Sequence, residues 1–221
     1  CGDGSRNLAM GPDLPLPPRS WSWRIPPGAT RRVGGGWPLE SPDDRELLPG
    51  MRSQTIPALA DGVVYVHNDV GLWSFDVVAT TPKILWKYET SHSPSVVLPE
   101  DRVLHTVTVQ DGIVYANLVC TVESQKQQLD FLIVQAPVPR RALMAFSART
   151  GKLLWTIGGQ KDARDPKLRA SFQAAPAAER GRLYVGAAFQ KERPTDPVEQ
   201  HLFCLDAKTG EVIWSRYVAE G

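Results

Sequence analysis

The side chains best suited to metal or acid–base chemistry are scattered along the 221-residue chain. No histidine lies three or four residues from another, and no two cysteines form a Cys-x-x-Cys pair. These residues are His67, His92, His105 and His201, and Cys1, Cys120 and Cys204. Structural zinc sites and small disulfide scaffolds need such paired spacings. We therefore predict no metal site and assign no catalytic residue to this group.

One short segment gathers an imidazole, an amide and a carboxylate. It is His67-Asn68-Asp69-Val70-Gly71, which could serve as a catalytic loop or a calcium loop. It also lies between two apolar runs, where Asn, Asp and Gly are the residues that a hairpin turn requires. We therefore interpret the segment as a turn.

The charge balance argues against two classes of partner. The chain has 25 Lys and Arg against 24 Asp and Glu, which gives a formal net charge of +1. A protein that binds nucleic acid or an anionic membrane surface usually carries a clear basic excess. No stretch approaches the roughly 18 apolar residues of a transmembrane helix. We predict no nucleic-acid partner and no transmembrane segment.

Three similar units follow one another from about residue 53. Each begins with a glycine that leads into a β-branched and aromatic run, and two further apolar runs follow. The three sets of runs are 61–66, 72–76 and 83–86; then 111–116, 143–147 and 152–155; then 180–185, 202–206 and 211–214. Each closing run ends in a tryptophan, Trp86, Trp155 or Trp214. An internal repeat of short runs and turn residues indicates a repeat architecture.

The connections within the units favour hairpins. Residues 148–152 and 207–211 each place a glycine, Gly151 or Gly210, where a tight turn needs positive φ. Pro57 and Pro176 lie near the start of a further strand, where a missing N–H costs little. No segment keeps a helical period, and the nearest helical candidate, residues 173–180, is interrupted by proline. The expected fold class is all-β, a partial β-propeller of about three four-stranded antiparallel blades.

The last unit resembles one propeller family in particular. Residues 205–214, Leu-Asp-Ala-Lys-Thr-Gly-Glu-Val-Ile-Trp, resemble the tryptophan-docking repeat of the pyrroloquinoline-quinone-like propellers. Ser147 stands where the second unit should have the aspartate, and the first unit has Ala79-Thr80-Thr81-Pro82 in place of the Thr-Gly turn. The predicted structural blade residues are Trp86, Trp155, Trp214, Gly151, Gly210, Asp76 and Asp206.

The resemblance implies two classes of function. The family includes quinoprotein dehydrogenases and an outer-membrane assembly lipoprotein that acts as a scaffold. The dehydrogenases resemble one another in a disulfide between adjacent cysteines, a tryptophan on the quinone, and a carboxylate, Asn and Asp around calcium. This sequence has no adjacent cysteine pair and no Cys-x-x-Cys-His haem attachment. We therefore expect a non-catalytic scaffold or protein-binding module of a bacterial envelope protein, without a cofactor; the alternative is a fragment of a quinoprotein oxidoreductase whose cofactor site is completed elsewhere.

The first 52 residues differ from the rest. Residues 1–50 hold nine prolines and eight glycines, which disfavour regular structure, yet include Trp21, Trp23 and Trp37. We expect an extended arm over residues 1–52 that lies on a protein surface, the alternative being a disordered linker, and propeller blades over 53–221. The first residue, Cys1, is either a lipid attachment site of an envelope or periplasmic lipoprotein or an arbitrary fragment boundary.

Two features point to partners. Residues 117–140 of the second unit separate runs that the first unit joins directly, so they form either a binding insertion or a long hairpin. Propellers close with about four to eight blades, whereas this sequence shows three units. We expect further propeller polypeptide or another chain to complete the ring.

Overall fold

The structure is a computed structural model of the 221-residue chain. It describes residues 54–68, 71–78, 83–90, 104–129, 132–160, 165–189 and 198–220. The predicted arm over residues 1–52 lies outside the described residues, and so does Cys1. Within the described part the chain is all-β apart from one four-residue helix, α1 (Pro166–Arg169), so none of its helices could cross a membrane.

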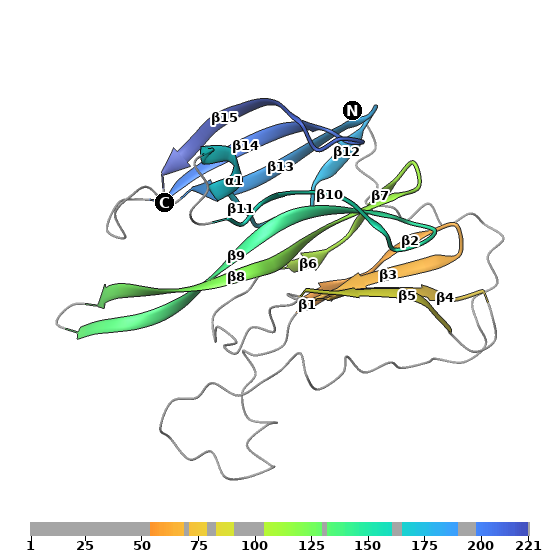
Figure 1. Ribbon diagram of the computed structural model, residues 1–221, viewed down its shortest axis with the longest axis horizontal. Coiled ribbons are helices and arrows are strands. Elements are labelled where there is room, and N and C mark those ends of the chain that lie inside the picture. Colours follow the sequence, from red (N-terminus) through yellow and green to blue (C-terminus); the bar gives the residue numbers. More distant parts are fainter. Residues whose placement is uncertain are drawn as a thin grey trace, which may run out of the picture.

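Three antiparallel sheets follow one another along the chain, and we call them blades 1 to 3 (Figure 1). Blade 1 contains β2 (Ala58–Ala60), β3 (Val63–His67), β4 (Gly71–Asp76) and β5 (Lys83–Glu89). Blade 2 contains β7 (Thr108–Gln110), β8 (Ile113–Leu129), β9 (Leu132–Ser147) and β10 (Leu153–Gly158). Blade 3 contains β12 (Ala177–Glu179), β13 (Arg182–Phe189), β14 (Glu199–Asp206) and β15 (Val212–Glu220). Sequential antiparallel strands are the arrangement of a propeller blade, so the predicted fold class is confirmed.

A further short strand precedes the first strand of each blade. β1 (Gln54–Ile56) precedes β2, β6 (Leu104–Thr106) precedes β7, and β11 (Ser171–Phe172) precedes β12. β1 and β6 pair with each other in parallel, whereas β11 pairs with β13 and gives the third sheet a fifth strand. Residues 173–180 therefore contain β12 and not the helix that was the nearest helical candidate; the described helix lies earlier, at α1.

The turn between the first two strands has the same geometry in every blade. Both central residues of each turn have positive φ. The values are 49° and 74° at Asp61 and Gly62, 51° and 75° at Asp111 and Gly112, and 49° and 74° at Arg180 and Gly181. Two positive φ values define a type I′ turn, whose twist matches that of the strands it joins. The glycine that opens each sequence unit is therefore fixed by the hairpin.

The apolar core lies between the blades rather than within one sheet. Leu72 of blade 1 clusters with Val114, Leu118 and Phe146 of blade 2. The opposite face of blade 2 contributes Tyr115 and Leu143 to a second cluster with Phe172, Leu183 and Phe203 of blade 3, all at most 1% exposed. Alternate residues of β8 thus face different neighbours, because side chains alternate along a strand. Blade 2 is covered on both faces.

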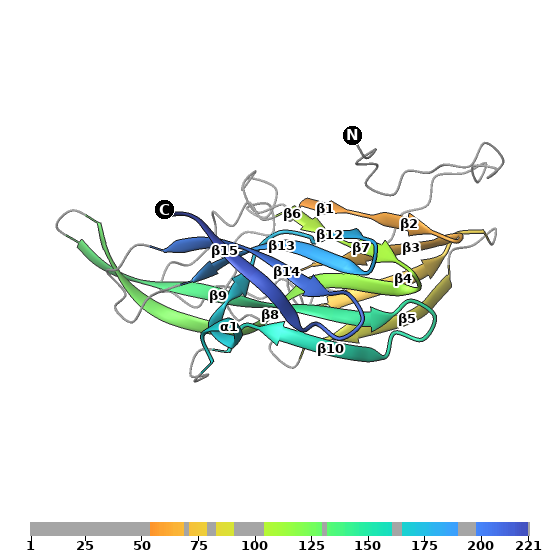
Figure 2. The same ribbon diagram turned by 90° about the horizontal axis from the view of Figure 1, so that it is seen from above.

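The insertion of the second unit is a long hairpin. β8 and β9 stay paired from Ile113 and Ser147 out to Leu129 and Leu132, beyond the strands of the other blades (Figures 1 and 2). The register shifts once, between Val119 and Thr121, so Cys120 is an extra residue at a β-bulge. The bulge follows directly on the end of the pairing between β9 and β10 at Ala142.

Candidate functional site

Blade 1 is attached to blade 2 by two aromatic side chains that reach one carbonyl. The Trp86 Nε1–H donates to the Ala148 oxygen at 2.8 Å, and the Tyr65 hydroxyl donates to the same oxygen at 3.4 Å. The two ring centroids lie 5.9 Å apart. Ala148 precedes the turn between β9 and β10, where Gly151 has a φ of 69°. We call Tyr65, Trp86, Ala148 and Gly151 the first docking clasp.

Blade 2 is attached to blade 3 in the same way. The Trp155 Nε1–H donates to the Ala207 oxygen at 3.2 Å, and the Tyr115 hydroxyl donates to it at 3.0 Å. The ring centroids are again 5.9 Å apart, and Gly210 in the adjoining turn has a φ of 74°. Tyr115, Trp155, Ala207 and Gly210 form the second docking clasp. The clasp is thus a repeated interface that runs from each blade to the next one along the chain.

The clasp glycines are required by space as well as by φ. A Cβ atom at Gly151 would lie 2.5 Å from Cδ2 of Trp86, and one at Gly210 would lie 2.7 Å from Cδ2 of Trp155. Real Cβ atoms do not approach other atoms so closely. The indole therefore packs flat against a backbone that only glycine leaves open.

Burial affects the acidity of the clasp phenols. Burial, followed by the charges of Asp111 and Asp206, raises the pKa of Tyr115 to about 12. Burial and the charge of Asp61 raise the pKa of Tyr65 in the same direction. Both hydroxyls therefore stay protonated at neutral pH and remain hydrogen-bond donors to the clasp carbonyls.

The two receiving turns are held by different side chains. In blade 3 the Asp206 Oδ1 accepts the N–H groups of Thr209 and Lys208 at 2.9 Å each, and the Thr209 hydroxyl at 3.2 Å. The two backbone hydrogen bonds lower the pKa of Asp206, with Thr209 making the larger contribution. In blade 2 Ser147 stands in that position, and its Oγ accepts only the Thr150 N–H, at 3.4 Å. Asp76 of blade 1 accepts the Val78 N–H at 2.9 Å.

Blade 3 carries a third aromatic pair of the same kind. The Tyr184 and Trp214 ring centroids lie 6.1 Å apart, close to the separation in the two clasps. Among the described residues no Thr-Gly turn meets this pair. The residue before each of the three tryptophans is about half exposed: Leu85 46%, Leu154 46% and Ile213 47%. The last strands of the three blades, β5, β10 and β15, thus expose the same position.

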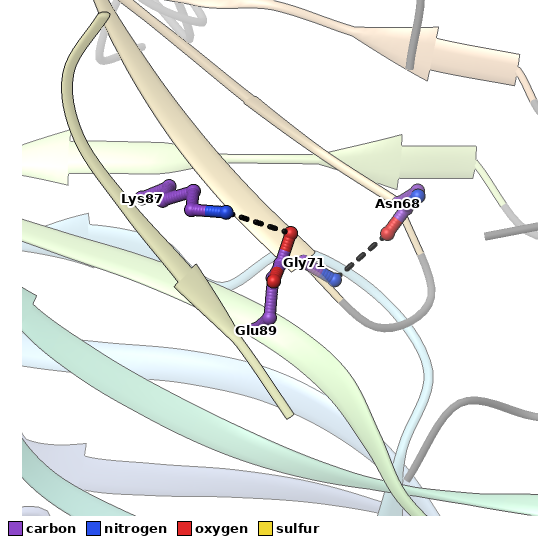
Figure 3. Close-up of polar contacts among 4 residues, drawn as sticks. All are labelled: Asn68, Gly71, Lys87 and Glu89. Carbon is purple, nitrogen blue, oxygen red and sulfur yellow. Dashed lines mark hydrogen bonds and ion pairs between the residues drawn. The ribbon is translucent and has the colours of Figure 1, made fainter. Parts of the chain in front are cut away.

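Asn68 and Gly71 of the His67 segment lie at the two ends of the connection between β3 and β4 (Figure 3). The Asn68 Oδ1 accepts the Gly71 N–H at 2.7 Å, and the Asn68 N–H donates to the Gly71 oxygen at 3.0 Å. The same end of the sheet carries an exposed ion pair, Lys87 with Glu89 at 3.5 Å. Such surface pairs contribute little to stability. The amide of Asn68 therefore holds a turn.

The imidazole of His67 links blades 1 and 2. It is 2% exposed, and its Nε2 lies 3.0 Å from the oxygen of Thr106 on β6. Its Nδ1 lies 2.9 Å from the oxygen of Asn68. Both neighbours are carbonyl oxygens, so the buried ring connects β3 to β6 through backbone groups.

Blades 2 and 3 share further polar contacts. The Asn117 Nδ2 donates to the Ala174 oxygen, and the Thr108 hydroxyl donates to the Pro176 oxygen. Beside them the Arg140 Nη1 donates to the Arg169 oxygen at 3.3 Å. These side chains bind backbone carbonyls in the segment that leads into β12, and so they position blade 3 against blade 2.

The remaining candidate residues are dispersed. Cys204 is fully buried in blade 3, and Cys120 lies at the bulge of β8 with its Sγ 3.2 Å from the Gly159 oxygen. The Nε2 of His201 lies 3.0 Å from Glu199 Oε2. Among the residues that the structure describes, no three His, Cys, Asp or Glu side chains come together as a metal site.

The sequence interpretation missed the tyrosines and alanines of the clasps. A signal was present, because a tyrosine follows the turn glycine by three residues in every unit: Tyr65, Tyr115 and Tyr184. An alanine, Ala148 or Ala207, follows the position of the turn-capping residue in the two units that have a Thr-Gly turn. Only the structure shows that both aromatic residues donate to that alanine's carbonyl.

Comparisons with known proteins agree with this architecture. A family model described as outer membrane protein assembly factor BamB matches residues 139–221. Lupanine 17-hydroxylase [cytochrome c] of a Pseudomonas species is 28% identical over 178 residues, which cover 75% of this chain and 20% of that protein. The quinoprotein alcohol dehydrogenase PedH of Pseudomonas putida is 29% identical over 171 residues, covering 76% and 23%.

Solved structures of quinoprotein enzymes include a similar fold. A europium-containing methanol dehydrogenase superposes with a TM-score of 0.51 at 18% identity, covering 76% of this chain and 25% of that one. The chain spans about a fifth of the length of the curated relatives it matches. The three blades therefore correspond to part of a propeller in those proteins.

Proposed function

We propose that the chain, whose repeats resemble those of the pyrroloquinoline-quinone-like β-propellers, is a section of a propeller that serves as a protein-binding scaffold. In this proposal residues 53–221 are the blades and residues 1–52 are an arm that lies on a protein surface. The blades carry out no redox chemistry. They form a rigid support for the loops and the long hairpin, which bind a partner.

The observation that carries this proposal is that the buried and turn-forming polar side chains contact backbone groups. His67 faces two backbone carbonyls, Asp206 accepts two backbone N–H groups, and Asn117 donates to a carbonyl of the next blade. An active site instead aims such groups at a shared point near the reacting atoms. Their engagement with backbone supports a structural role for the blade ends.

The third aromatic pair supports completion of the propeller by further polypeptide. Tyr184 and Trp214 have the separation of the pairs that dock on Ala148 and Ala207. A fourth blade with an alanine carbonyl and a Thr-Gly turn fits this pair. The blade comes from polypeptide beyond this chain or from another chain, because blade 1 has Ala79-Thr80-Thr81-Pro82 where the turn would be.

The alternative is that the chain is part of the propeller of a quinoprotein oxidoreductase whose cofactor site is completed elsewhere. The similarity to two Pseudomonas enzymes, at 28% and 29% identity, favours it. The described residues do not supply what such a cofactor needs, since Cys120 and Cys204 lie in different blades and no carboxylate cluster is formed. A quinone site would therefore have to be built by other parts of the protein.

Reconstitution of the full-length protein separates the two functions. The purified protein is mixed with pyrroloquinoline quinone and calcium, and its absorbance and alcohol-dependent dye reduction are measured. A quinoprotein alcohol dehydrogenase treated in parallel is the positive control. On a desalting column a scaffold leaves in the void volume without the quinone, which follows with the small solutes, and it reduces no dye. Stoichiometric co-elution of the quinone with the protein overturns the scaffold proposal.

The cellular address is a separate proposal. We propose that the protein works in the bacterial envelope or periplasm, which the match of residues 139–221 to the outer membrane protein assembly factor BamB model supports. Fractionation of cells that make the full-length protein tests this: recovery in the envelope or periplasmic fraction supports the proposal, whereas recovery in the cytosol rejects it.

A further inference from the structure

The three blades lie in a row, and its two end faces can be compared at matching positions (Figure 1). In β4, β9 and β14 a leucine lies two residues before the residue that pairs with both aromatic side chains of its blade: Leu72, Leu143 and Leu202. Leu72 and Leu143 face the next blade and are 0% exposed. Leu202, with no described blade in front of it, is 37% exposed. An end face without cover thus leaves its central leucine open to solvent.

The outer face of blade 1, at the other end of the row, differs from this. Trp73 and Phe75 of β4 alternate with Leu72, which faces blade 2, so their side chains project from the opposite face of the sheet. No described blade precedes blade 1, and neither residue belongs to a core cluster of the described residues. Both are nevertheless 2% exposed. The outer face of blade 1 is therefore covered.

The neighbouring side chains of blade 1 do not account for this cover. Phe75 has Val64 and Ile84 beside it in register, and Ile84 is itself 43% exposed. The Trp73 indole lies over the backbone of Gly71, where an added Cβ would collide with the ring. Side chains of adjacent strands stand beside a ring rather than on top of it. The cover therefore comes from another part of the protein.

Blade 1 lacks the turn on which the tryptophan of a preceding blade would dock. In both clasps the alanine and the glycine lie one and four residues after the turn-capping residue. One and four residues after Asp76 the sequence has Val77 and Thr80. A Cβ at the two clasp glycines would lie 2.5 or 2.7 Å from the indole, so a threonine at this position leaves no space for a docked tryptophan. The sequence thus argues against a preceding blade as the cover.

Two longer stretches next to blade 1 lie outside the described residues. Residues 91–103 join β5 to β6, and β6 leads into β7, so this connection ends on the side of blade 1 that faces blade 2. Residues 1–52 reach blade 1 at its first strand and include Trp21, Trp23 and Trp37. Tryptophan is the side chain that buries the most apolar area per residue. The arm is therefore better suited than the connection to cover two aromatic rings.

We propose that the arm, residues 1–52, lies on the outer face of blade 1 over Trp73 and Phe75 and takes the place of a preceding blade. This inference rests on the proposed function, in which the arm lies on a protein surface, and it names that surface. The end units of repeat proteins need such a cap, because their outer apolar faces are otherwise uncovered. With blade 1 capped, a further blade is added only at the face of blade 3 that carries Tyr184 and Trp214.

Photo-crosslinking in the full-length protein tests the position of the arm. p-Benzoylphenylalanine replaces Ile84 on the outer face of blade 1, or Leu202 on the end face of blade 3 as the matched control, since these side chains are 43% and 37% exposed. Mass spectrometry identifies the crosslinked peptides, and a denaturing gel separates crosslinks within one chain from those between chains. We expect the probe at position 84 to crosslink to residues 1–52 of its own chain, and the probe at position 202 not to reach them.

The same experiment can overturn the proposal. A probe at position 84 that crosslinks only to residues 91–103, to polypeptide outside residues 1–52 or to a second chain shows a different cover. A probe that gives no crosslink to residues 1–52 does so as well. Co-elution of the quinone in the reconstitution experiment would reject the scaffold function but leave the crosslink unchanged, so the two proposals fail separately.

Hydroxyl-radical footprinting measures the exposure of the covered face. In a variant of the full-length protein without residues 1–52, we expect oxidation of Trp73 to rise severalfold. Met144, which is buried between blades 1 and 2, should keep its protection and so identifies folded protein. Continued protection of Trp73 in the folded variant contradicts the proposal. The crosslink at position 84 tests it without any deletion.

Discussion

The receiving turns of blades 2 and 3 differ in the side chain that holds them, yet each receives a tryptophan in the same way. Asp206 makes three hydrogen bonds within its turn, whereas Ser147 makes one long hydrogen bond. Both turns place a carbonyl and a glycine against the incoming indole. Docking therefore depends on the backbone shape of the turn, and the capping side chain adjusts its stability.

The largest effect is expected from the docking tryptophans. Trp155→Ala should lower the free energy of unfolding by about 3 to 5 kcal/mol, because a large side chain packed between two blades is removed. Trp86→Ala should have a similar effect, and Trp214→Ala a smaller one in this chain. Urea denaturation measures all three. Near-equal losses for Trp214 and Trp155 would show that the clasp is not what stabilises the blade interface.

The clasp glycines come next. Gly210→Val should cost about 1 to 3 kcal/mol, because a β-branched residue is strained at positive φ. Gly112→Val is the matched control, since Gly112 has a φ of 75° but no atom within 4 Å of an added Cβ. Thermal denaturation should show the larger loss at Gly210. A greater loss at Gly112 would mean that the contact with Trp155 does not limit the site.

Exchanging the capping residues Ser147 and Asp206 should exchange the pH dependence of the two turns. The pKa of Asp206 is lowered in the folded chain, so its contribution is present above the unfolded pKa and is lost as pH falls through the folded pKa. Ser147→Asp should stabilise blade 2 at pH 7 and add a second acid-sensitive contribution. Asp206→Ser should remove the first. Denaturation of both variants at pH 7 and pH 3 tests this, and a pH-independent gain from Ser147→Asp would contradict it.

The smallest effect is expected at a type I′ turn. Arg180 has a φ of 49°, the left-handed region, where asparagine and aspartate are tolerated better than arginine. Arg180→Asn should stabilise blade 3 by about 0.5 kcal/mol. Asp61→Arg, the reverse change in the equivalent turn of blade 1, should destabilise by a similar amount. Differential scanning calorimetry detects both shifts.

The blades were predictable because their determinants are local. Type I′ turns need glycine, and a Thr-Gly pair between two alternating runs indicates a hairpin turn. Gly151 and Gly210 have positive φ as expected. The fold class and the resemblance to the pyrroloquinoline-quinone-like repeat followed from these units. The interpretation of residues 117–140 stayed open, because extra-long strands and a binding insertion have the same sequence pattern.

The contacts between blades were not predictable in the same way. The acceptor of Trp86 is 62 residues away, and the acceptor of His67 is 39 residues away. β1 and β6 have three residues each, too few for alternation to show, and their parallel pairing is set by the packing of two blades. Site geometry of this kind depends on tertiary neighbours that no local pattern specifies.

The one-way direction of the clasp has a consequence during synthesis. Blade 1 leaves the ribosome first, but Trp86 cannot dock until Ala148, 62 residues later, has been made. At about 5 to 20 residues per second this interval lasts roughly 3 to 12 s. During that time the finished sheet of blade 1 carries an undocked indole. Each new blade provides the docking site for the tryptophan of the preceding blade and then carries an undocked tryptophan of its own. Ribosome pausing or chaperone contact is thus most consequential just before the Thr-Gly turns of blades 2 and 3 emerge.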